Sequence, residues 1–120
     1  MEIIGIGTDI IEIERVAKVM AENHRFASRI FTRAELDYCR DKKNCYPHFA
    51  ARFAAKEAVG KAIGRPISWQ DVEVVKGSEG KPEIRLHGEA KTAADGCRVF
   101  LTMSHSRDYA TAVAVLALES

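Results

Sequence analysis

Hydrophobic and polar positions alternate at the start of the chain and then repeat at helical spacing. Residues 2 to 8, EIIGIGT, place successive side chains on opposite faces, which predicts a strand. Around Asp9 the period changes, and apolar residues such as Ile10 and Ile13 predict a helix that ends near residue 22.

Two further helices are indicated by the residues at their ends. Residues 33 to 42 follow Thr32, and Glu35 lies three positions after it, which is the spacing of a capping box. A longer helix is predicted over YPHFAARFAAKEAVGKAIG. Pro47 in its first turn and Gly64 after its last turn are the residues expected at those positions.

The second half of the chain has mostly the pattern of strands. Residues 71 to 76 and 83 to 87 flank GSEGKP and predict a hairpin. A short helix, GEAKTAADG, ends at Gly96, and two apolar strands over 98 to 104 and 109 to 118 are joined by HSRD. This order predicts an α+β fold in which an antiparallel sheet packs against a long central helix.

Length and composition narrow the class of protein. The chain has 120 residues, which predicts one domain over 1–120, and its 47% hydrophobic content supplies a core. A formal net charge of +1 gives no field for nucleic acid or a membrane. MEIIGIGTDII lacks the basic segment of a signal peptide, and no apolar run approaches the roughly 20 residues of a membrane span. The three cysteines lack C-x-x-C spacing and fit the reduced thiols of a cytoplasmic protein.

Glu57 is out of place in the pattern of the long helix. At about 100° per residue, one stripe of that helix contains Phe49, Ala50, Phe53, Ala54, Glu57, Gly60 and Lys61. A carboxylate among aromatic and small side chains is costly to bury alone, so a positive group should meet it. Two interpretations stay open. In the first, Lys61, four residues later, forms an ordinary helix ion pair with Glu57. In the second, a metal ion lies over this face, and Lys61 beside the metal binds an anion.

Asp9 is a second carboxylate with two interpretations. It is followed three residues later by Glu12, so it is a candidate N-cap of the first helix. Alternatively, Gly5 and Gly7 on the same strand face clear space beside it for a bulky ligand. Asp9 and Glu57 together, without a His or Cys pair, would suit Mg²⁺, which takes one or two protein carboxylates and completes its shell with water and phosphates.

The loop SHSRDY and a basic flank of the long helix are weaker candidates. The hydroxyls and imidazole of Ser104, His105 and Ser106 suit hydrogen bonds to phosphate oxygens, although a polar hairpin turn is the simpler interpretation. Arg52 and Lys56 lie on one flank of the long helix, where a solvated basic edge is the simpler interpretation.

Four motifs occur in order over nearly the whole chain: GIGTDIIEIERV, FTRAELDYC, RFAAKEAVGKAIG and MSHSRDYA. Together they resemble the holo-acyl-carrier-protein synthases, the short bacterial type of 4′-phosphopantetheinyl transferase. The resemblance implies that family's fold and its reaction in fatty acid biosynthesis. The 4′-phosphopantetheine arm of coenzyme A moves to a serine of an apo acyl carrier protein, and adenosine 3′,5′-bisphosphate leaves.

The resemblance also implies roles for the candidate residues. Asp9 and Glu57 match the family's Mg²⁺ ligands, and with Lys61, near the pyrophosphate, they form the expected catalytic set. The positions that match the coenzyme A site are Arg52, Lys56, Lys61, Ser104, His105 and Ser106. Family members usually assemble as homotrimers with sites between subunits. The chemistry is compatible with these residues, because phosphoryl transfer depends chiefly on positioning and charge stabilisation. The sequence leaves the acceptor of the serine proton open.

A basic stretch around the first predicted helix is the expected docking surface for an acidic carrier protein. It contains Arg15, Lys18, Arg25, Arg29 and Arg33. Glu14 and Glu22 interrupt it, whereas the family pattern is more uniformly basic, so the carrier proteins accepted are not fixed by the pattern. Two other classes stay open: a Mg²⁺-dependent hydrolase of nucleotide pyrophosphates, and a coenzyme A binding module without catalysis.

Overall fold

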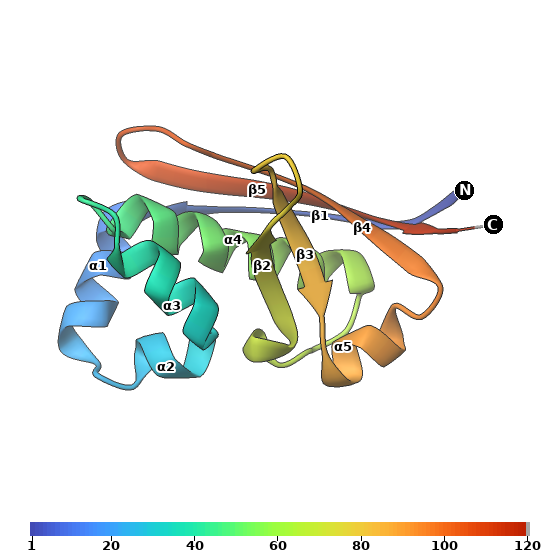
Figure 1. Cartoon of the computed structure of the whole chain (residues 1–120), viewed down its shortest axis with the longest axis horizontal. Helices are drawn as coiled ribbons and strands as arrows, with labels where there is room; N and C mark the ends of the chain where they lie inside the picture. The colour runs from blue at the N-terminus through green and yellow to red at the C-terminus, as the bar shows by residue number, and fades with distance from the viewer. Residues whose placement is uncertain (120) are drawn as a thin grey trace.

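A long antiparallel sheet lies along one side of a central helix in the computed structural model, which describes residues 1–119 (Figure 1). The elements in chain order are β1 (Glu2–Glu12), α1 (Ile13–Glu22), α2 (Phe26–Ile30), α3 (Arg33–Arg40), α4 (Tyr46–Ile63), η1 (Trp69–Asp71), β2 (Val72–Lys76), β3 (Pro82–Leu86), α5 (Gly88–Ala93), β4 (Cys97–His105) and β5 (Tyr109–Leu118). The three-stranded sheet has the order β1-β5-β4, and β2 and β3 form a separate two-stranded sheet. All pairs are antiparallel, so the predicted α+β class is confirmed.

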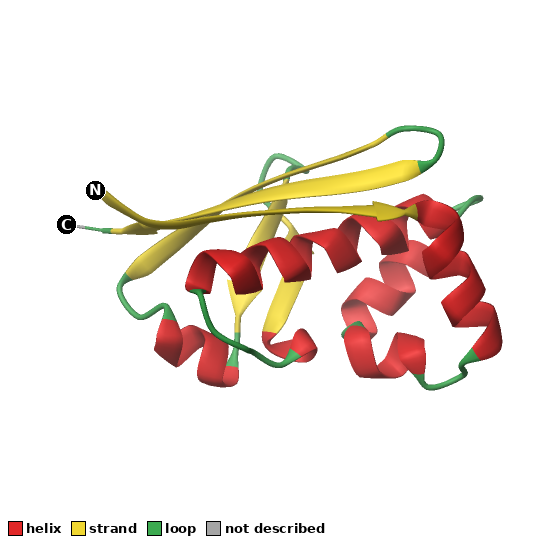
Figure 2. Cartoon of the chain, turned by 180° about the vertical axis from the view of Figure 1, so that it is seen from behind, coloured by secondary structure: helices red, strands yellow, loops and turns green. Residues whose placement is uncertain are grey.

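The central helix α4 is buried on almost every side, and the other elements divide into two groups around it. Helices α1 to α3 gather at its N-terminal end, and the β2–β3 hairpin with α5 lies toward its C-terminal end (Figure 2). Two hydrophobic clusters correspond to these groups, and α4 supplies alanines to both. A helix with apolar residues on most of its faces is expected to be internal, because it has little polar surface to give to solvent.

Strand β1 approaches α4 closely because two of its residues have no side chain. A Cβ at Gly5 would collide with the backbone carbonyl of Ala62, and one at Gly7 would collide with that of Ala58. The backbones of strand and helix are therefore in contact at these positions. This contact fixes Asp9, two residues after Gly7, opposite the second half of α4.

The first strand is longer than the pattern predicted, and this changes the assignment of Asp9. β1 extends to Glu12 because β5 pairs with it as far as Tyr109, and Asp9 lies opposite Ala112 inside the ladder. The N-cap of α1 is Glu12, so the interpretation of Asp9 as a helix cap is wrong. The long-range pairing with β5 overrides the local helical pattern after Asp9.

Other local predictions are confirmed, with two omissions. The capping box of α3 is present, with Thr32 and Glu35 each bonding the other's backbone N–H. α4 starts beside Pro47 and ends at Gly64, whose φ of 85° is left-handed. The helices α2 and η1 were not predicted, because five and three residues are too short to establish a period. Among the described residues, no helix combines the length and apolar character needed to cross a membrane.

Candidate active site

Glu57 lies on the wall between two cavities on the same side of α4. The smaller, of about 340 Å³, runs between the C-terminal half of α4 and the segment before β2, and Lys61, Ser68 and Trp69 also line it. The larger, of about 450 Å³, is bounded by β1, α1 and α2, and Asp9 lines it with Glu57. A ligand in either cavity would meet the carboxylate of Glu57.

Lys61 pairs with Asp9 across the gap between α4 and β1. Its ammonium lies 3.4 Å from the Asp9 carboxylate and donates to the backbone carbonyl of Thr8 at 2.9 Å. Within the part of the chain that the structure describes, no ion pair joins Lys61 to Glu57. The ordinary helix pair offered as one explanation of Glu57 is therefore absent, because the lysine is drawn to the strand.

The cluster supplies too little positive charge to balance the carboxylate of Glu57. Burial raises the pKa of the Glu57 carboxyl, the charge of Asp9 raises it further, and Lys61 only partly opposes both effects. Asp9, Glu57 and Lys61 therefore place two carboxylates close together with only one ammonium. A cation placed beside Asp9 and Glu57 would relieve this imbalance.

The donor set in this cluster suits a hard cation completed by a substrate. No group of three or more His, Cys, Asp or Glu side chains capable of holding a metal is found among residues 1–119. Asp9 and Glu57 would therefore supply only two carboxylates. That number matches Mg²⁺, which usually keeps several waters and binds substrate phosphates, and it does not match a closed protein cage.

The basic flank of α4 is buried, so its interpretation as a solvated edge is wrong. Arg52 is 8% exposed and Lys56 is 2% exposed. The Lys56 ammonium lies 2.8 Å from a carboxylate oxygen of Glu35. Burial lowers the pKa of Lys56, and the charge of Glu35 opposes that change. Local spacing could not have predicted this, since Glu35 belongs to a different helix.

Arg52 and His105 belong to a second cluster, at the other end of α4. The His105 ring is 6.1 Å from the ring of His48, and the Arg52 guanidinium lies 4.3 Å over the ring of Tyr38. His48 precedes Glu57 by nine positions, which is roughly 13 Å along a helix axis. One chain therefore brings Asp9, Glu57 and Lys61 together, but leaves His105 and Arg52 apart from them.

The polar loop of the second cluster is a tight connection between β4 and β5. The backbone N–H of Ser106 donates to the carbonyl of Tyr109 at 2.8 Å, and Ser104 lies in β4 opposite Thr111. The side chains of Ser104, His105 and Ser106 are exposed. Tyr38 and His48 in this cluster were missed by the sequence analysis, and their aromatic character close to basic residues is the signal that could have found them.

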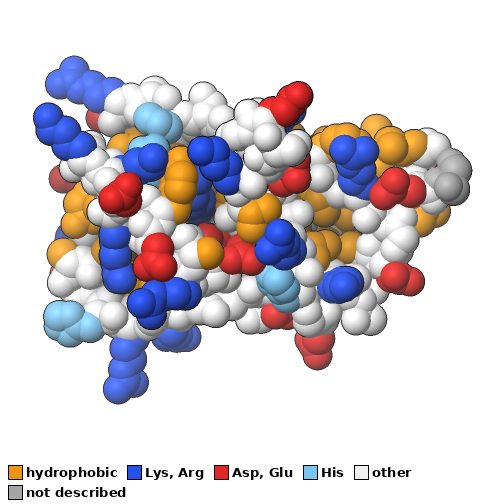
Figure 3. All heavy atoms as spheres, in the orientation of Figure 1, with side chains coloured by type: hydrophobic (Ala, Val, Ile, Leu, Met, Phe, Trp, Pro, Cys, Tyr) orange, Lys and Arg blue, Asp and Glu red, His pale blue; other side chains and the backbone are white. Residues whose placement is uncertain are grey.

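The predicted docking residues form an exposed surface at the helical end. Figure 3 shows Lys and Arg side chains gathered over the end that carries α1 to α3 in Figure 1, with some acidic side chains among them. Arg15, Lys18, Arg25 and Arg29 are all exposed. Arg15 also lines the larger cavity beside Glu57, so this basic surface and the carboxylate cluster are continuous.

Comparison with known proteins gives matches along almost the entire chain. The model of the 4′-phosphopantetheinyl transferase superfamily matches residues 5–114. A holo-[acyl-carrier-protein] synthase of Chlamydia caviae is 48% identical over 120 residues, covering 96% of this chain and 98% of that protein. The crystal structure of the holo-ACP-synthase of Plasmodium yoelii is similar with a TM-score of 0.87 and 32% identity, covering 99% of this chain and 98% of the other. The holo-(acyl-carrier-protein) synthase of Bacillus anthracis, in complex with CoA (3′,5′-ADP), has a TM-score of 0.84 and 34% identity over 99% of this chain and 100% of that one.

Proposed function

The chain belongs to the 4′-phosphopantetheinyl transferase superfamily, and we propose that it is a holo-acyl-carrier-protein synthase. It transfers the 4′-phosphopantetheine group of coenzyme A to a serine of an apo acyl carrier protein, releases adenosine 3′,5′-bisphosphate, and serves fatty acid biosynthesis. The observation that carries this proposal is the cluster of Asp9, Glu57 and Lys61 between two cavities. One cavity has room for a phosphorylated substrate, and the other opens beside the basic helical end.

Coenzyme A is proposed as the donor substrate, with its pyrophosphate beside Lys61. The complex of the Bacillus anthracis relative with CoA (3′,5′-ADP) supports this ligand. In this chain the smaller cavity brings Lys61 and Arg65 to one rim, and two cations favour a polyphosphate. Arg52, Ser104, His105 and Ser106 are proposed to bind the remaining phosphate and nucleotide.

Mg²⁺ is proposed as the cofactor, held by Asp9 and Glu57. The raised pKa of Glu57 supports this, because it reflects a carboxylate whose charge lacks a sufficient partner in the protein alone. When bound, Mg²⁺ would supply Lewis-acid stabilisation of phosphate oxygens. The two carboxylates would orient the ion, and Asp9 also holds the Lys61 ammonium at a distance of 3.4 Å.

The chain's own residues contribute position and charge to the transfer. The serine oxygen forms a bond to the phosphorus nearer the pantetheine and loses its proton to solvent, while the bond from that phosphorus to the bridging oxygen breaks. The leaving adenosine 3′,5′-bisphosphate takes the electron pair and gains negative charge. The proposed role of the Lys61 ammonium is to stabilise this charge, since charge stabilisation is the usual source of catalysis in phosphoryl transfer.

An acidic carrier protein is proposed to dock on the exposed basic surface of Arg15, Lys18, Arg25 and Arg29. Continuity between Arg15 and Glu57 along the larger cavity supports this, because a serine delivered at α1 would have a short path to the carboxylates. A cytoplasmic location is also proposed, and the three free cysteines support it, since such thiols persist in a reducing compartment.

A homotrimer with sites between subunits is proposed from an exposed apolar sheet face. Ile6 of β1 lies opposite Val115, and Val115 lies opposite Phe100, so all three side chains share the face that points away from α4. Ile6 and Ile10 are 63% and 66% exposed in the single chain. An apolar surface of this kind usually meets a partner. A second copy would also bring a His105 and Arg52 cluster to the carboxylates that lack one.

The direct test is incubation of the protein with coenzyme A, Mg²⁺ and an apo acyl carrier protein, followed by intact mass measurement. We expect the carrier protein to gain the mass of one phosphopantetheine group. Cleavage of coenzyme A without a mass gain on the carrier would indicate a hydrolase. Binding of coenzyme A with no turnover would indicate a binding module. Either of these two results would overturn the proposed function.

A further inference from the structure

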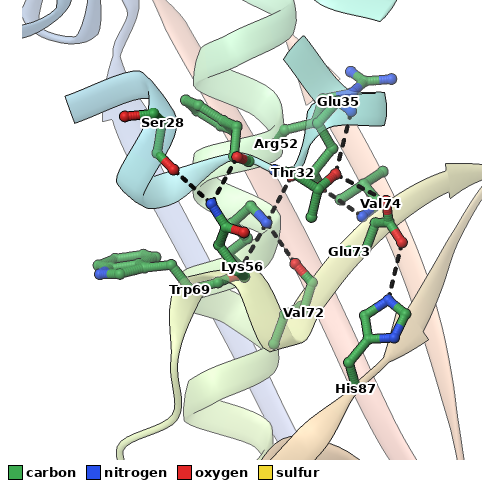
Figure 4. A network of polar contacts seen from close by, with 12 residues as sticks. Ser28, Thr32, Glu35, Arg52, Lys56, Trp69, Val72, Glu73, Val74 and His87 are labelled. Carbon is green, nitrogen blue, oxygen red and sulfur yellow. Dashed lines mark hydrogen bonds and ion pairs between the residues drawn. The ribbon is translucent and has the colours of Figure 1, made fainter. Parts of the chain in front are cut away.

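A buried polar network joins α3, α4, η1 and β2 behind the wall of the smaller cavity (Figure 4). At its centre the Lys56 ammonium lies 2.8 Å from Glu35 and donates to the backbone carbonyls of Trp69, at 3.0 Å, and Val72, at 2.5 Å. The side chains of Lys56 and Glu35 are 1% and 0% exposed. An ammonium has three N–H donors, and all three have protein acceptors here. No donor of Lys56 is left for a phosphate oxygen.

The carboxylate of Glu35 is bonded as completely as its partner. One oxygen accepts from the backbone N–H of Thr32 at 2.8 Å, and the other accepts from the N–H of Val74 at 2.7 Å. The same side chain therefore caps α3, bonds to the middle of β2 and neutralises Lys56. Buried ion pairs add little net stability compared with apolar residues of similar size. Their presence is better explained by the specific arrangement that they impose.

The pair of Lys56 and Glu35 fixes the wall of the smaller cavity that lies opposite Glu57. The two carbonyls bound by Lys56 belong to the residues at the start and just after the end of η1. The ring of Trp69 stacks on Phe53, one turn before Glu57, with centroids 5.0 Å apart and planes 22° apart. Trp69 and Val72 line the smaller cavity from one side, and Lys56 and Glu57 line it from α4. Lys56 thus ties the two sides of the cavity together next to the proposed metal ligand.

We propose that Lys56 and Glu35 are positioning residues that set the width of the coenzyme A cavity and hold Trp69 in its wall, without touching the nucleotide. This inference rests on the proposed function, because it assigns coenzyme A to the smaller cavity. It assigns to Glu35, on a helix that lines neither that cavity nor the larger one, an influence on substrate binding.

A contact role and a positioning role for Lys56 predict different mutational patterns. If the ammonium contacted a phosphate, Lys56→Met would weaken coenzyme A binding, whereas Glu35→Gln would leave it unchanged or strengthen it. If the pair positions the wall, the two substitutions act alike. Their combined effect is then no larger than the stronger single effect, because both remove the same restraint.

The experiment uses the variants Lys56→Met, Glu35→Gln and the double variant, which leaves neither charge of the pair buried. Trp69 is the only tryptophan of the chain, so its fluorescence reports the cavity wall without any ligand. We expect each folded variant to show red-shifted emission and roughly twofold stronger acrylamide quenching, because the stacked ring becomes more accessible to water. The KM for coenzyme A should rise roughly tenfold, with kcat changed by less than about threefold, as loss of ground-state positioning predicts.

A matched control removes a different ion pair from the same helix. Asp37→Asn breaks the exposed pair of Arg33 and Asp37 on α3, which are 3.3 Å apart, and should leave both readouts unchanged. If a variant of Lys56 fails to fold by circular dichroism, Glu35→Gln, which retains an acceptor oxygen, provides the same comparison.

Two results would overturn the positioning role. One is an unchanged Trp69 emission in a folded variant, and the other is a coenzyme A defect confined to Lys56→Met. Failure of the proposed function is distinguishable from both, because the wild-type protein would then transfer no phosphopantetheine to the carrier protein, while the Trp69 measurement would still respond to the variants.

Discussion

The ammonium of Lys61 lies 3.4 Å from the carboxylate of Asp9, which is 52 positions away on β1, and not beside Glu57 one turn earlier on the same helix. The long-range pair follows from the contact between β1 and α4 at Gly7, which brings the strand within reach of the lysine. Glu57 is left with a raised pKa and without a protein cation of its own. This relationship separates the interpretations of Glu57, because a simple structural ion pair no longer accounts for it.

Isosteric neutralisation of either carboxylate should abolish most of the transfer activity. Glu57→Gln and Asp9→Asn keep the side-chain shape but remove a proposed Mg²⁺ ligand. We expect activity at saturating coenzyme A to fall at least about 100-fold, since metal stabilisation of phosphate charge is worth several kcal/mol. Glu89→Gln, on a helix that lines neither cavity, is the control and should retain full activity. Near-normal transfer by Glu57→Gln or Asp9→Asn at ordinary Mg²⁺ would refute the shared metal site.

The stability of Glu57→Gln should exceed that of the wild type in a pH-dependent way. Folding raises the pKa of Glu57 above its ordinary value of 4.5, so the folded wild type loses stability as the pH rises through the raised value. The glutamine cannot ionise and avoids that loss. In thermal melts with EDTA, the gain in Tm should be absent below about pH 4 and should grow toward pH 7.

Addition of Mg²⁺ provides the complementary measurement for the same variant. The wild type should gain stability with Mg²⁺, because a ligand that binds only the folded state raises Tm, whereas Glu57→Gln should gain much less. A difference in Tm between the two proteins that does not change with pH would show that ionisation of the buried Glu57 carboxyl does not destabilise the fold.

Local signals in the sequence predicted helix ends better than the end of the first strand. The capping box of Thr32 and Glu35 involves neighbours in the chain, and so does the stop at Gly64, so both were predictable. The extension of β1 to Glu12 depends on pairing with Tyr109, almost a hundred residues later. No local pattern contains that information, and the residues after Asp9 fit a helix equally well.

The candidate site was predictable by residue type, but not by environment. Glu57 was identified because a carboxylate interrupts an apolar stripe, and Asp9 because of its neighbouring glycines. The four-residue spacing of Arg52 and Lys56 fitted an exposed edge, yet Lys56 is buried against Glu35, 21 positions earlier on another helix. Burial of a lysine depends on a distant partner, which the spacing within one helix cannot predict.

Replacement of Gly7 by alanine should destabilise the whole protein. The new Cβ would collide with the backbone carbonyl of Ala58, which cannot rotate away as a side chain could. We expect a loss of about 1–3 kcal/mol or more in the free energy of unfolding, as for other overpacked cores. Urea denaturation measures this value.

Gly60→Ala is the matched control, because it adds the same methyl group on α4. There the Cβ would meet only a side-chain atom of Ile67, at 3.9 Å. Alanine is a better helix former than glycine by about 1 kcal/mol, so this variant should be more stable than the wild type. Equal effects of Gly7→Ala and Gly60→Ala would contradict the close contact between β1 and α4.

Charge reversal on the basic surface should weaken the binding of the carrier protein but not the binding of coenzyme A. Arg15→Glu and Arg25→Glu place a negative charge opposite an acidic partner, and we expect roughly tenfold weaker binding at low ionic strength. The defect should shrink at high salt, because exposed charges are screened. Lys91→Glu, an exposed reversal on α5, should have no effect. Equal losses of affinity for the carrier protein and for coenzyme A would indicate misfolding and not a docking role.

The sheet face of β1 should determine assembly. Ile6→Asp puts a charge on the exposed apolar face without entering the core, so the chain should fold but sediment as a monomer, whereas the wild type should sediment as a larger species, most simply a trimer. Thr92→Asp, exposed on α5, is the control and should assemble normally. Activity of the wild type should fall on dilution below the assembly constant. A monomeric Ile6→Asp protein with full activity would contradict a site shared between chains.

Complementation between two inactive variants tests that shared site directly. Glu57→Gln removes one carboxylate from the first cluster of its own chain. His105→Ala removes one ring from the second cluster, which lies beside His48, nine positions before Glu57 on α4. If each site takes its carboxylates from one chain and its histidine from a neighbour, mixed assemblies contain some sites with both residues intact. Mixing the two variants and allowing their subunits to exchange should therefore restore part of the activity, whereas each variant alone stays inactive. No recovery after confirmed exchange would place both clusters' functions within one chain. In that case a single extended coenzyme A would have to reach both clusters along α4 of the same chain.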